Sequence, residues 1–228
     1  EIIPQPSPTR SIRWTNGNDP DTASDANYLV VSSASEPLQN GWIDDAGTPF
    51  VFSSEQLYRL VPTFGSLSAF VAVDTACNEG LWAPWAMAHT KFGTFFLTRN
   101  GISVTQGGGP AQSITDPDLK PLFPADGTTS DAIRNLAPVD LTLTSRLRLA
   151  MVGDYLYFDY VDVDGIAHTL VYEPKYNRWT PDFYTPGVMM RVGEPGPQVL
   201  THMVEGADGN LYQYSNDKTA DDMTAVPY

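Results

Sequence analysis

The sequence predicts an all-β protein, a propeller-like array of antiparallel blades that makes up an incomplete ring. Three observations predict this class: short apolar strands bounded by turn residues, paired strands that recur at intervals of about 45 to 60 residues, and weak helix signals. Hairpins that recur by chance, as in a β-sandwich, are the alternative. Sandwich turns, however, usually recur every ~8 to 12 residues, without this longer spacing.

The chain is expected to form one propeller-like domain over residues 1–228, because all-β chains of this size often fold as a single domain. It begins with Glu1 rather than a methionine and ends at Tyr228 without a recognisable terminal signal. We therefore expect it to be a fragment of a longer polypeptide.

The N-terminal segment combines turn residues with short apolar stretches. Residues 1–27 are rich in Pro, Asn, Asp, Ser and Thr. A short strand is expected at 11–15, anchored by Trp14, and then a polar loop, because Asn-Gly-Asn-Asp-Pro is strong turn chemistry. Residues 28–31, Tyr-Leu-Val-Val, predict a second strand, and residues 32–49 are expected to be rich in turns.

Two hairpins are predicted in the middle of the chain. Residues 50–52 and 57–61 are apolar and flank a polar turn at 53–56. Residues 93–104 repeat this plan around Arg99-Asn-Gly101, and Asn-Gly is the strongest short hairpin signal.

Two further copies of the plan are predicted in the second half of the chain. Residues 154–160 and 168–172 flank a turn at 162–165, and a fourth copy lies at 208–214. Two short helical turns are also predicted, at residues 116–123 and 129–136.

The formal net charge is −14, and the 13 Lys and Arg residues are scattered. Nucleic-acid binders need basic clusters, so we expect no grip on DNA or RNA phosphates. An acidic wall would instead let DNA slide past, although an acidic surface also serves solubility alone. Cys77 is the single cysteine, which excludes an internal disulfide and a cysteine-based metal site; it is expected to be buried. No apolar run is long enough to predict a membrane-spanning segment.

Motifs for nucleophilic catalysis and phosphate binding are incomplete. The histidines are His89, His168 and His202, and no Gly-x-Ser-x-Gly nucleophile motif accompanies them. His168 falls in a predicted strand, which favours a hydrogen-bonded or surface histidine over a base. The glycines at 107–109 lack the Lys-Ser/Thr ending of a phosphate loop and are expected to form a turn.

One acidic stretch resembles part of a calcium loop. Its members are Asp159, Asp162, Asp164 and Gly165. The first and last ligand positions of an EF-hand would fall on Tyr160 and Val171, which cannot serve. A hairpin turn is the better interpretation, and adventitious cation binding stays open.

Four tryptophans could form a sugar-binding platform or anchor the core. They are Trp42, Trp82, Trp85 and Trp179. Core anchoring is favoured because aromatic residues dominate burial in sheets. No sialidase box is present, and carboxylate pairs arise by chance among 27 Asp and Glu. No catalytic, cofactor-binding or metal-binding residue is therefore predicted, and the chain is expected not to be an enzyme.

An ordered series of turn-and-anchor patterns runs over most of the chain. It comprises residues 10–20, 27–30, 50–60, 84, 93–102, 112–116, 172–179, 209–214 and 221–225. In this order the patterns resemble the tail nozzle, or tail-tube hub, of short-tailed phages and the related packaged-DNA stabilisation proteins. One departure is Cys77-Asn-Glu-Gly80, where that family often has a Gly-Cys-x-x-Pro junction; Pro84 falls later here.

The resemblance implies a structural protein of the phage virion, part of the tail nozzle or hub. It implies a homo-oligomeric ring, contacts with neighbouring tail and portal-adaptor proteins, and a DNA conduit or plug used in DNA ejection. DNA would pass without sequence-specific binding, and no catalysis or cofactor is implied. With the net charge, this predicts an acidic channel face. Two alternatives stay open: a carbohydrate-binding or glycoside-cleaving propeller at a host surface, and a generic extracellular interaction propeller.

Overall fold

The computed structural model describes residues 10–14, 28–33, 35–63, 69–115, 119–124, 136–182, 189–192, 201–205, 211–214 and 224–225. In these residues the chain forms four four-stranded antiparallel sheets and one two-stranded sheet. Each four-stranded sheet is a simple meander, in which consecutive strands pair. This confirms the predicted class, an all-β protein with propeller-like blades.

The strands follow in chain order from sheet to sheet. A two-stranded sheet pairs β1 (Ser11–Arg13) with β2 (Tyr28–Val30). The first four-stranded sheet has β3 (Leu38–Ile43), β4 (Pro49–Ser53), β5 (Leu57–Pro62) and β6 (Phe70–Asp74). The second has β7 (Met87–Thr90), β8 (Gly93–Thr98), β9 (Gly101–Thr105) and β10 (Gln112–Ser113).

The second half of the chain supplies two more sheets. The third sheet has β11 (Arg148–Val152), β12 (Tyr155–Val161), β13 (Ala167–Glu173) and β14 (Arg178–Asp182). The fourth has β15 (Met189–Val192), β16 (Thr201–Glu205), β17 (Leu211–Tyr214) and β18 (Thr224–Ala225). Two 3-10 turns, η1 (Lys120–Leu122) and η2 (Thr144–Arg146), lie between the second and third sheets.

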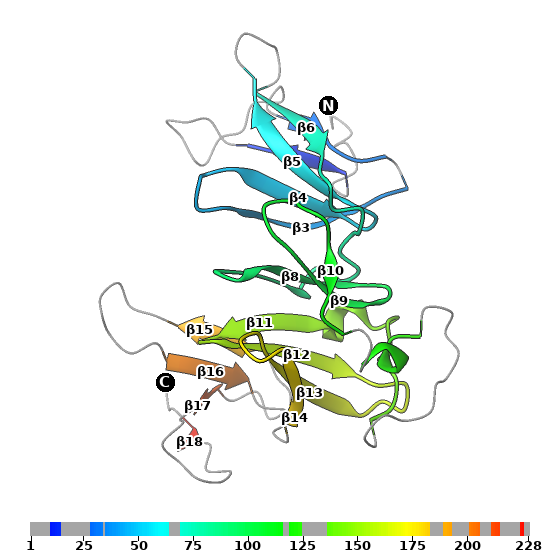
Figure 1. The fold of residues 1–228 in the computed structure, drawn as a ribbon, viewed down its shortest axis with the longest axis vertical. Helices are drawn as coiled ribbons and strands as arrows, with labels where there is room; N and C mark the ends of the chain where they lie inside the picture. The colour runs from blue at the N-terminus through cyan, green and yellow to red at the C-terminus, as the bar shows by residue number, and fades with distance from the viewer. Residues whose placement is uncertain are drawn as a thin grey trace, which may run out of the picture.

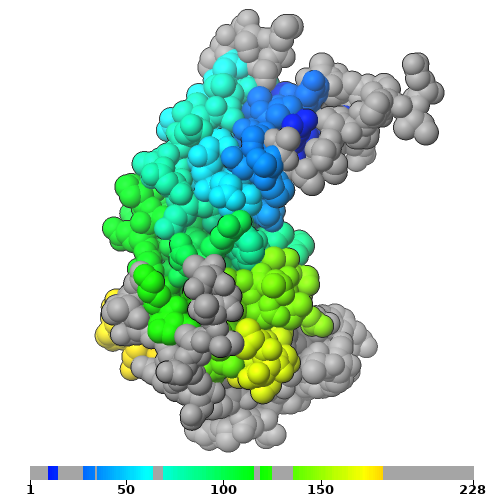
Figure 2. Space-filling view, turned by 90° about the vertical axis from the view of Figure 1, so that its right-hand side faces the viewer, coloured from blue at the N-terminus to red at the C-terminus, as the bar shows by residue number. Residues whose placement is uncertain are grey.

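The sheets follow one another along the long axis, and the first and fourth lie toward opposite ends (Figure 1). Figure 2 shows the first three as one continuous column. The first strands of successive sheets adjoin: β11 contacts both β7 and β15, and Trp42 of β3 stacks near His89 of β7 at 5.7 Å between ring centroids. Neighbouring first strands are the arrangement found around a propeller axis.

Strand β8 of the second sheet is buried on both faces and so joins the first and third sheets. On one face of β8, Phe96 packs against Phe52 of the first sheet at 4.6 Å between ring centroids. On the other face, Phe95 and Leu97 join the main core with the third sheet, where Phe95 meets Tyr172 at 6.1 Å. Burial on both faces explains why Thr-Phe-Phe-Leu in β8 lacks polar alternation.

Hydroxyl side chains close three of the hairpins in the same way. Ser53, Thr90 and Thr98 end strands, and each hydroxyl accepts the N–H two residues on and donates to the carbonyl three residues on. Such local bonds compete with strand continuation and so turn the chain. In the predicted Asn-Gly hairpin the two turn residues are Arg99 and Asn100, because Gly101 already pairs with Thr98.

Most predicted hairpins are confirmed, with strand bounds within a few residues. The predicted pairs correspond to β4–β5, β8–β9 and β12–β13, and the fourth copy matches β17. The predicted helical turn at 116–123 matches η1, and the one at 129–136 lies outside the described residues. The prediction for 32–49 was wrong in part, because β3 forms there with a bulge between Leu38 and Asn40.

Cys77 lies in the connection between the first and second sheets and is buried, as expected. It belongs to the apolar cluster formed by these sheets, and burial raises the pKa of its thiol. No helical segment in the described part of the chain has the length and apolar character that a bilayer crossing requires.

Candidate binding cleft on the third sheet

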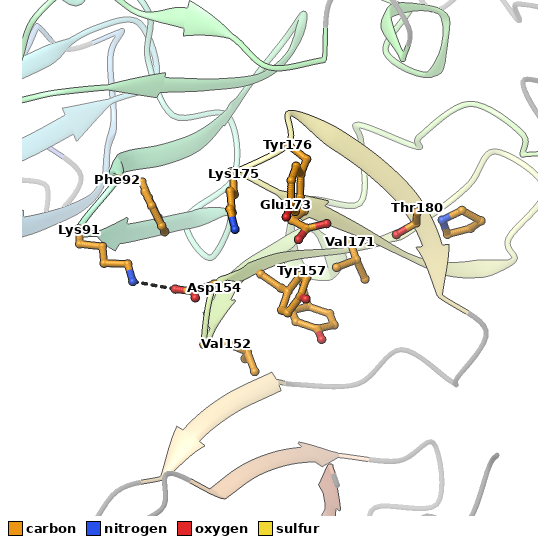
Figure 3. Close-up of a pocket in the computed structure, with 13 residues that line it drawn as sticks. Lys91, Phe92, Val152, Asp154, Tyr157, Val171, Glu173, Lys175, Tyr176 and Thr180 are labelled. Carbon is orange, nitrogen blue, oxygen red and sulfur yellow. Dashed lines mark hydrogen bonds and ion pairs between the residues drawn. The ribbon is translucent and has the colours of Figure 1, made fainter. Parts of the chain in front are cut away.

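A cleft of about 950 Å³ opens beside the third sheet. Three turns contribute to it: β7–β8, β11–β12 and β13–β14. The lining residues are Lys91, Phe92, Val152, Gly153, Asp154, Tyr155, Tyr157, Val171, Glu173, Lys175, Tyr176, Thr180 and Pro181. Figure 3 shows how their side chains surround the space.

The floor of the cleft follows from strand register. Tyr157 pairs with Val171, and Val171 pairs with Thr180, so these side chains form one row across β12, β13 and β14. Directly opposed residues share a face of the sheet. The residues between them, including Phe158 and Leu170, point to the other face and enter the main core. Alternation along the strands thus separates the core from the cleft.

The charged groups at the cleft edge form two ion pairs. Lys91 Nζ lies 2.7 Å from Asp154 Oδ1 and joins the turns of two sheets (Figure 3). Arg178 lies 3.1 Å from Glu173, whose side chain is mostly buried. Lys175 has no carboxylate within ion-pair distance among the described residues, and its ammonium lies 5.0 Å from the Tyr176 ring centroid.

Aromatic rings supply much of the accessible lining. Tyr155 is 43% exposed and Tyr176 is 61% exposed, whereas Tyr157 is buried in the floor. Exposed rings next to charged groups can stack on a planar or ring-shaped ligand while polar groups hold its substituents. The arrangement is chemically suited to binding, and the described residues that line the cleft include no nucleophile paired with a base.

The acidic stretch interpreted as a hairpin turn is confirmed as one. Asp162 Oδ1 accepts the N–H groups of Asp164 and Ile166, and Gly165 has a φ of +81°. Asp159 instead bonds the Thr169 hydroxyl at 2.6 Å. The described residues hold no group of three or more His, Cys, Asp or Glu side chains suited to a metal ion.

The histidine of the predicted strand is hydrogen-bonded, as expected. His168 Nε2 lies 2.7 Å from Asp162 Oδ2, and its ring packs on Tyr160. Tyr160 is 1% exposed, and its hydroxyl has no hydrogen-bond partner among the described residues. Burial, with the Asp162 carboxylate nearby, raises the pKa of this phenol. His89 shares a hydrogen bond with Thr94, and His202 lies in β16, whose side chains are outside the described set.

The four tryptophans do not form one platform. Trp42, Trp82 and Trp179 pack against the apolar clusters, and Trp82 and Trp179 donate their indole N–H groups to Leu141 and Ile114. Core anchoring is therefore confirmed for these three. Trp85 differs, being 65% exposed and outside the clusters.

The residues of the cleft could not be predicted from the sequence. Lys91, Asp154 and Lys175 all lie in or next to hairpin turns, where charged residues are common on any soluble protein. Their spacing carries no motif, since three separate turns bring them together. The clustering of turn residues from successive blades was the available signal.

Comparisons with known proteins give distant structural matches. No protein-family model matches the chain, and neither does any curated protein sequence. Twelve solved chains match. One is a candidate 6-phosphogluconolactonase from Bacteroides uniformis, with a TM-score of 0.41 and 12% identity over 87% of this chain and 57% of that one.

A second match is the extracellular domain of the BT4673 hybrid two-component system of B. thetaiotaomicron. Its TM-score is 0.31, with 12% identity over 96% of this chain and 30% of that one. The present chain therefore spans well under two thirds of either matched chain. At this distance the matches carry no argument about function.

Proposed function

We propose that this chain is a non-catalytic structural part of a larger propeller-like ring in a phage virion tail. In this role it contributes blades to the wall of a DNA conduit or plug and contacts further copies and neighbouring tail proteins. DNA passes the wall without sequence-specific binding. The resemblance to tail nozzle proteins favours a phage tail as the location. The exposed two-stranded sheet at the end of the column of sheets supports assembly into a larger ring.

The observation that carries the proposal is the uncovered outer face of the two-stranded sheet. Tyr28 and Val30 are alternate residues of β2, so they share a face, and they are 44% and 47% exposed. Leu29, between them, is less exposed. A short apolar sheet face with this exposure favours packing of a further sheet.

The electrostatics of the proposed channel differ from the sequence prediction. The first strands β3, β7, β11 and β15 contain no Asp or Glu, and they include Arg148 and Arg191. Carboxylates lie instead in the turn after β3, at Asp44 and Asp45, whereas Asp154 in the turn after β11 pairs with Lys91 in the turn after β7. We therefore propose an acidic rim at one end of the channel instead of an acidic wall along it.

The test is assembly of the full-length polypeptide that contains this chain. Mass photometry and cryo-electron microscopy should reveal a closed ring, and immunogold labelling should place the protein at the tail of phage particles. Val30→Asp should reduce ring formation without lowering the midpoint of thermal unfolding. Val163→Asp, at a similarly exposed valine in the β12–β13 turn, is the matched control.

A full-length protein that stays monomeric and never associates with particles would overturn the proposal. So would a Val30→Asp variant that assembles as well as the control variant, because the uncovered face would then have no part in assembly.

A further inference from the structure

The cleft on the third sheet provides the chemistry of a saccharide site, which the structural role does not require. It offers hydrogen-bond acceptors on Asp154 and Glu173, donors on Lys91 and Lys175, and a hydroxyl on Thr180. Sugars need all three kinds of group, because their hydroxyls both donate and accept. Its volume lies near the upper end of the ~300–1,000 Å³ typical of small-ligand sites, which suits a short oligosaccharide.

Exposed aromatic rings add a surface for the sugar ring itself. Tyr155 lies in the floor near the β11–β12 turn, and Tyr176 lies at the tip of the β13–β14 turn. Both are accessible, and Phe92 from the second sheet adds a third ring. The apolar C–H face of a sugar packs on such rings, which bury apolar area at a small cost in side-chain entropy.

The charge balance of the cleft selects among saccharides. Asp154 is neutralised by Lys91, and Glu173 by Arg178. Lys175 is left as the cation without a carboxylate partner among the described residues, and it extends between Phe92 and Glu173 in the view of Figure 3. One unpaired ammonium in a partly enclosed site favours a ligand with a carboxylate at that point.

We propose that this cleft binds an acidic saccharide, with Lys175 pairing to a sugar carboxylate and Tyr155 and Tyr176 stacking on the sugar rings. A polyphosphate chain suits the cleft less well, because Asp154 and Glu173 would repel its closely spaced charges. The overall charge of −14 opposes an anion only weakly at physiological salt, where charges beyond about 8 Å are screened.

The test compares two probes with the same sugar chain, the charged trigalacturonate and its uncharged methyl ester, by isothermal titration calorimetry on the whole chain. The acid should bind. The ester should bind with an affinity lower by about tenfold or more, because it cannot pair with an ammonium. A glycan array of acidic and neutral bacterial oligosaccharides then identifies the preferred sugar.

Variants assign the binding to the cleft. Lys175→Gln should weaken trigalacturonate binding by about tenfold or more, and Lys175→Arg should restore most of it. Tyr155→Ala should weaken it as well. Trp85→Ala is the control, because Trp85 is also an exposed aromatic residue, at 65%, and does not line the cleft.

Three outcomes would overturn the inference: no binding to any acidic member of the array, equal binding of acid and ester, or unchanged binding by Lys175→Gln. Each leaves the structural role standing, since ring assembly is measured separately.

Discussion

Two turns, one between β3 and β4 and one between β12 and β13, have the same local structure in different surroundings. In each, an aspartate Oδ1 accepts two N–H groups: those of Ala46 and Thr48 for Asp44, and those of Asp164 and Ile166 for Asp162. In each, the glycine three residues after the aspartate has a φ of +81°. The backbone bonds that close the two turns also match.

The surroundings differ sharply. Asp44 lies in a half-exposed turn, whereas Asp162 is 2% exposed. The second oxygen of Asp162 pairs with His168, and the His168 ring packs on Tyr160. The same local motif therefore forms only a turn in the first sheet, whereas in the third sheet it also connects the turn to the core.

The largest expected effect comes from removing each aspartate. Asp162→Ala should lower the free energy of unfolding by about 3 kcal/mol, because it removes a buried carboxylate that accepts from two backbone N–H groups and pairs with the half-buried His168. Asp44→Ala should cost about 1 kcal/mol, since water can replace the lost bonds. Urea denaturation followed by tryptophan fluorescence measures both, and equal losses would remove the proposed difference between the turns.

The buried phenol next to this connection gives a gain rather than a loss. Tyr160→Phe should raise the free energy of unfolding by about 1 kcal/mol, because it removes a buried hydroxyl that has no partner in the described part of the chain. Tyr172→Phe is the control and should lower it by about 1 kcal/mol, because the Tyr172 hydroxyl donates to Asn177 at 2.9 Å. A Tyr160→Phe variant less stable than the wild type would show that the hydroxyl has a stabilising contact.

The glycines test whether the turns are locally equivalent. Gly47→Ala and Gly165→Ala should each cost about 1 kcal/mol, because alanine is strained at positive φ. A β-carbon at either position meets no atom within 4 Å, so packing adds nothing. The two losses, measured by thermal unfolding, should agree; a much larger loss at Gly165 would mean that the surroundings act on the backbone as well.

The smallest expected effect on stability is that of pH, because it appears only under alkaline conditions. The phenol of Tyr160 has a raised pKa in the folded protein, whereas in the unfolded chain it loses its proton near pH ~10. Unfolding above that pH therefore releases a proton, so the free energy of unfolding should fall as pH rises through 10 and beyond. Tyr160→Phe should fall less steeply than the wild type over this window, in denaturation curves at successive pH values.

The hairpins could be predicted because their signals are local. Apolar triplets around Ser53–Gln56 and the Asn-Gly step at 100–101 specify pairing within a few residues. The first strands could not be found in this way. β3 reads Leu-Gln-Asn-Gly-Trp-Ile, and its place depends on tertiary contacts such as Trp42 against His89 of the second sheet, 5.7 Å between ring centroids.

The shared aspartate turn and the cleft illustrate two further limits. The Asp-x-x-Gly pattern occurs at 44–47 and 162–165 and was visible, but nothing local distinguishes the buried copy from the exposed one. The cleft depends on three turns from two sheets, so only the packing of successive blades brings Lys91 to Asp154. A function could be proposed from the ordered resemblance in the sequence, whereas the cleft could be recognised only in the folded structure.

The buried thiol of Cys77 makes the junction between the first and second sheets chemically observable. The chain has no other cysteine, and this one packs in the cluster that includes Phe52 and Phe96. A disulfide reagent must wait for a fluctuation that separates these rings before it can react. The rate of thiol labelling in native buffer therefore reports how often the first and second sheets separate, without any mutation.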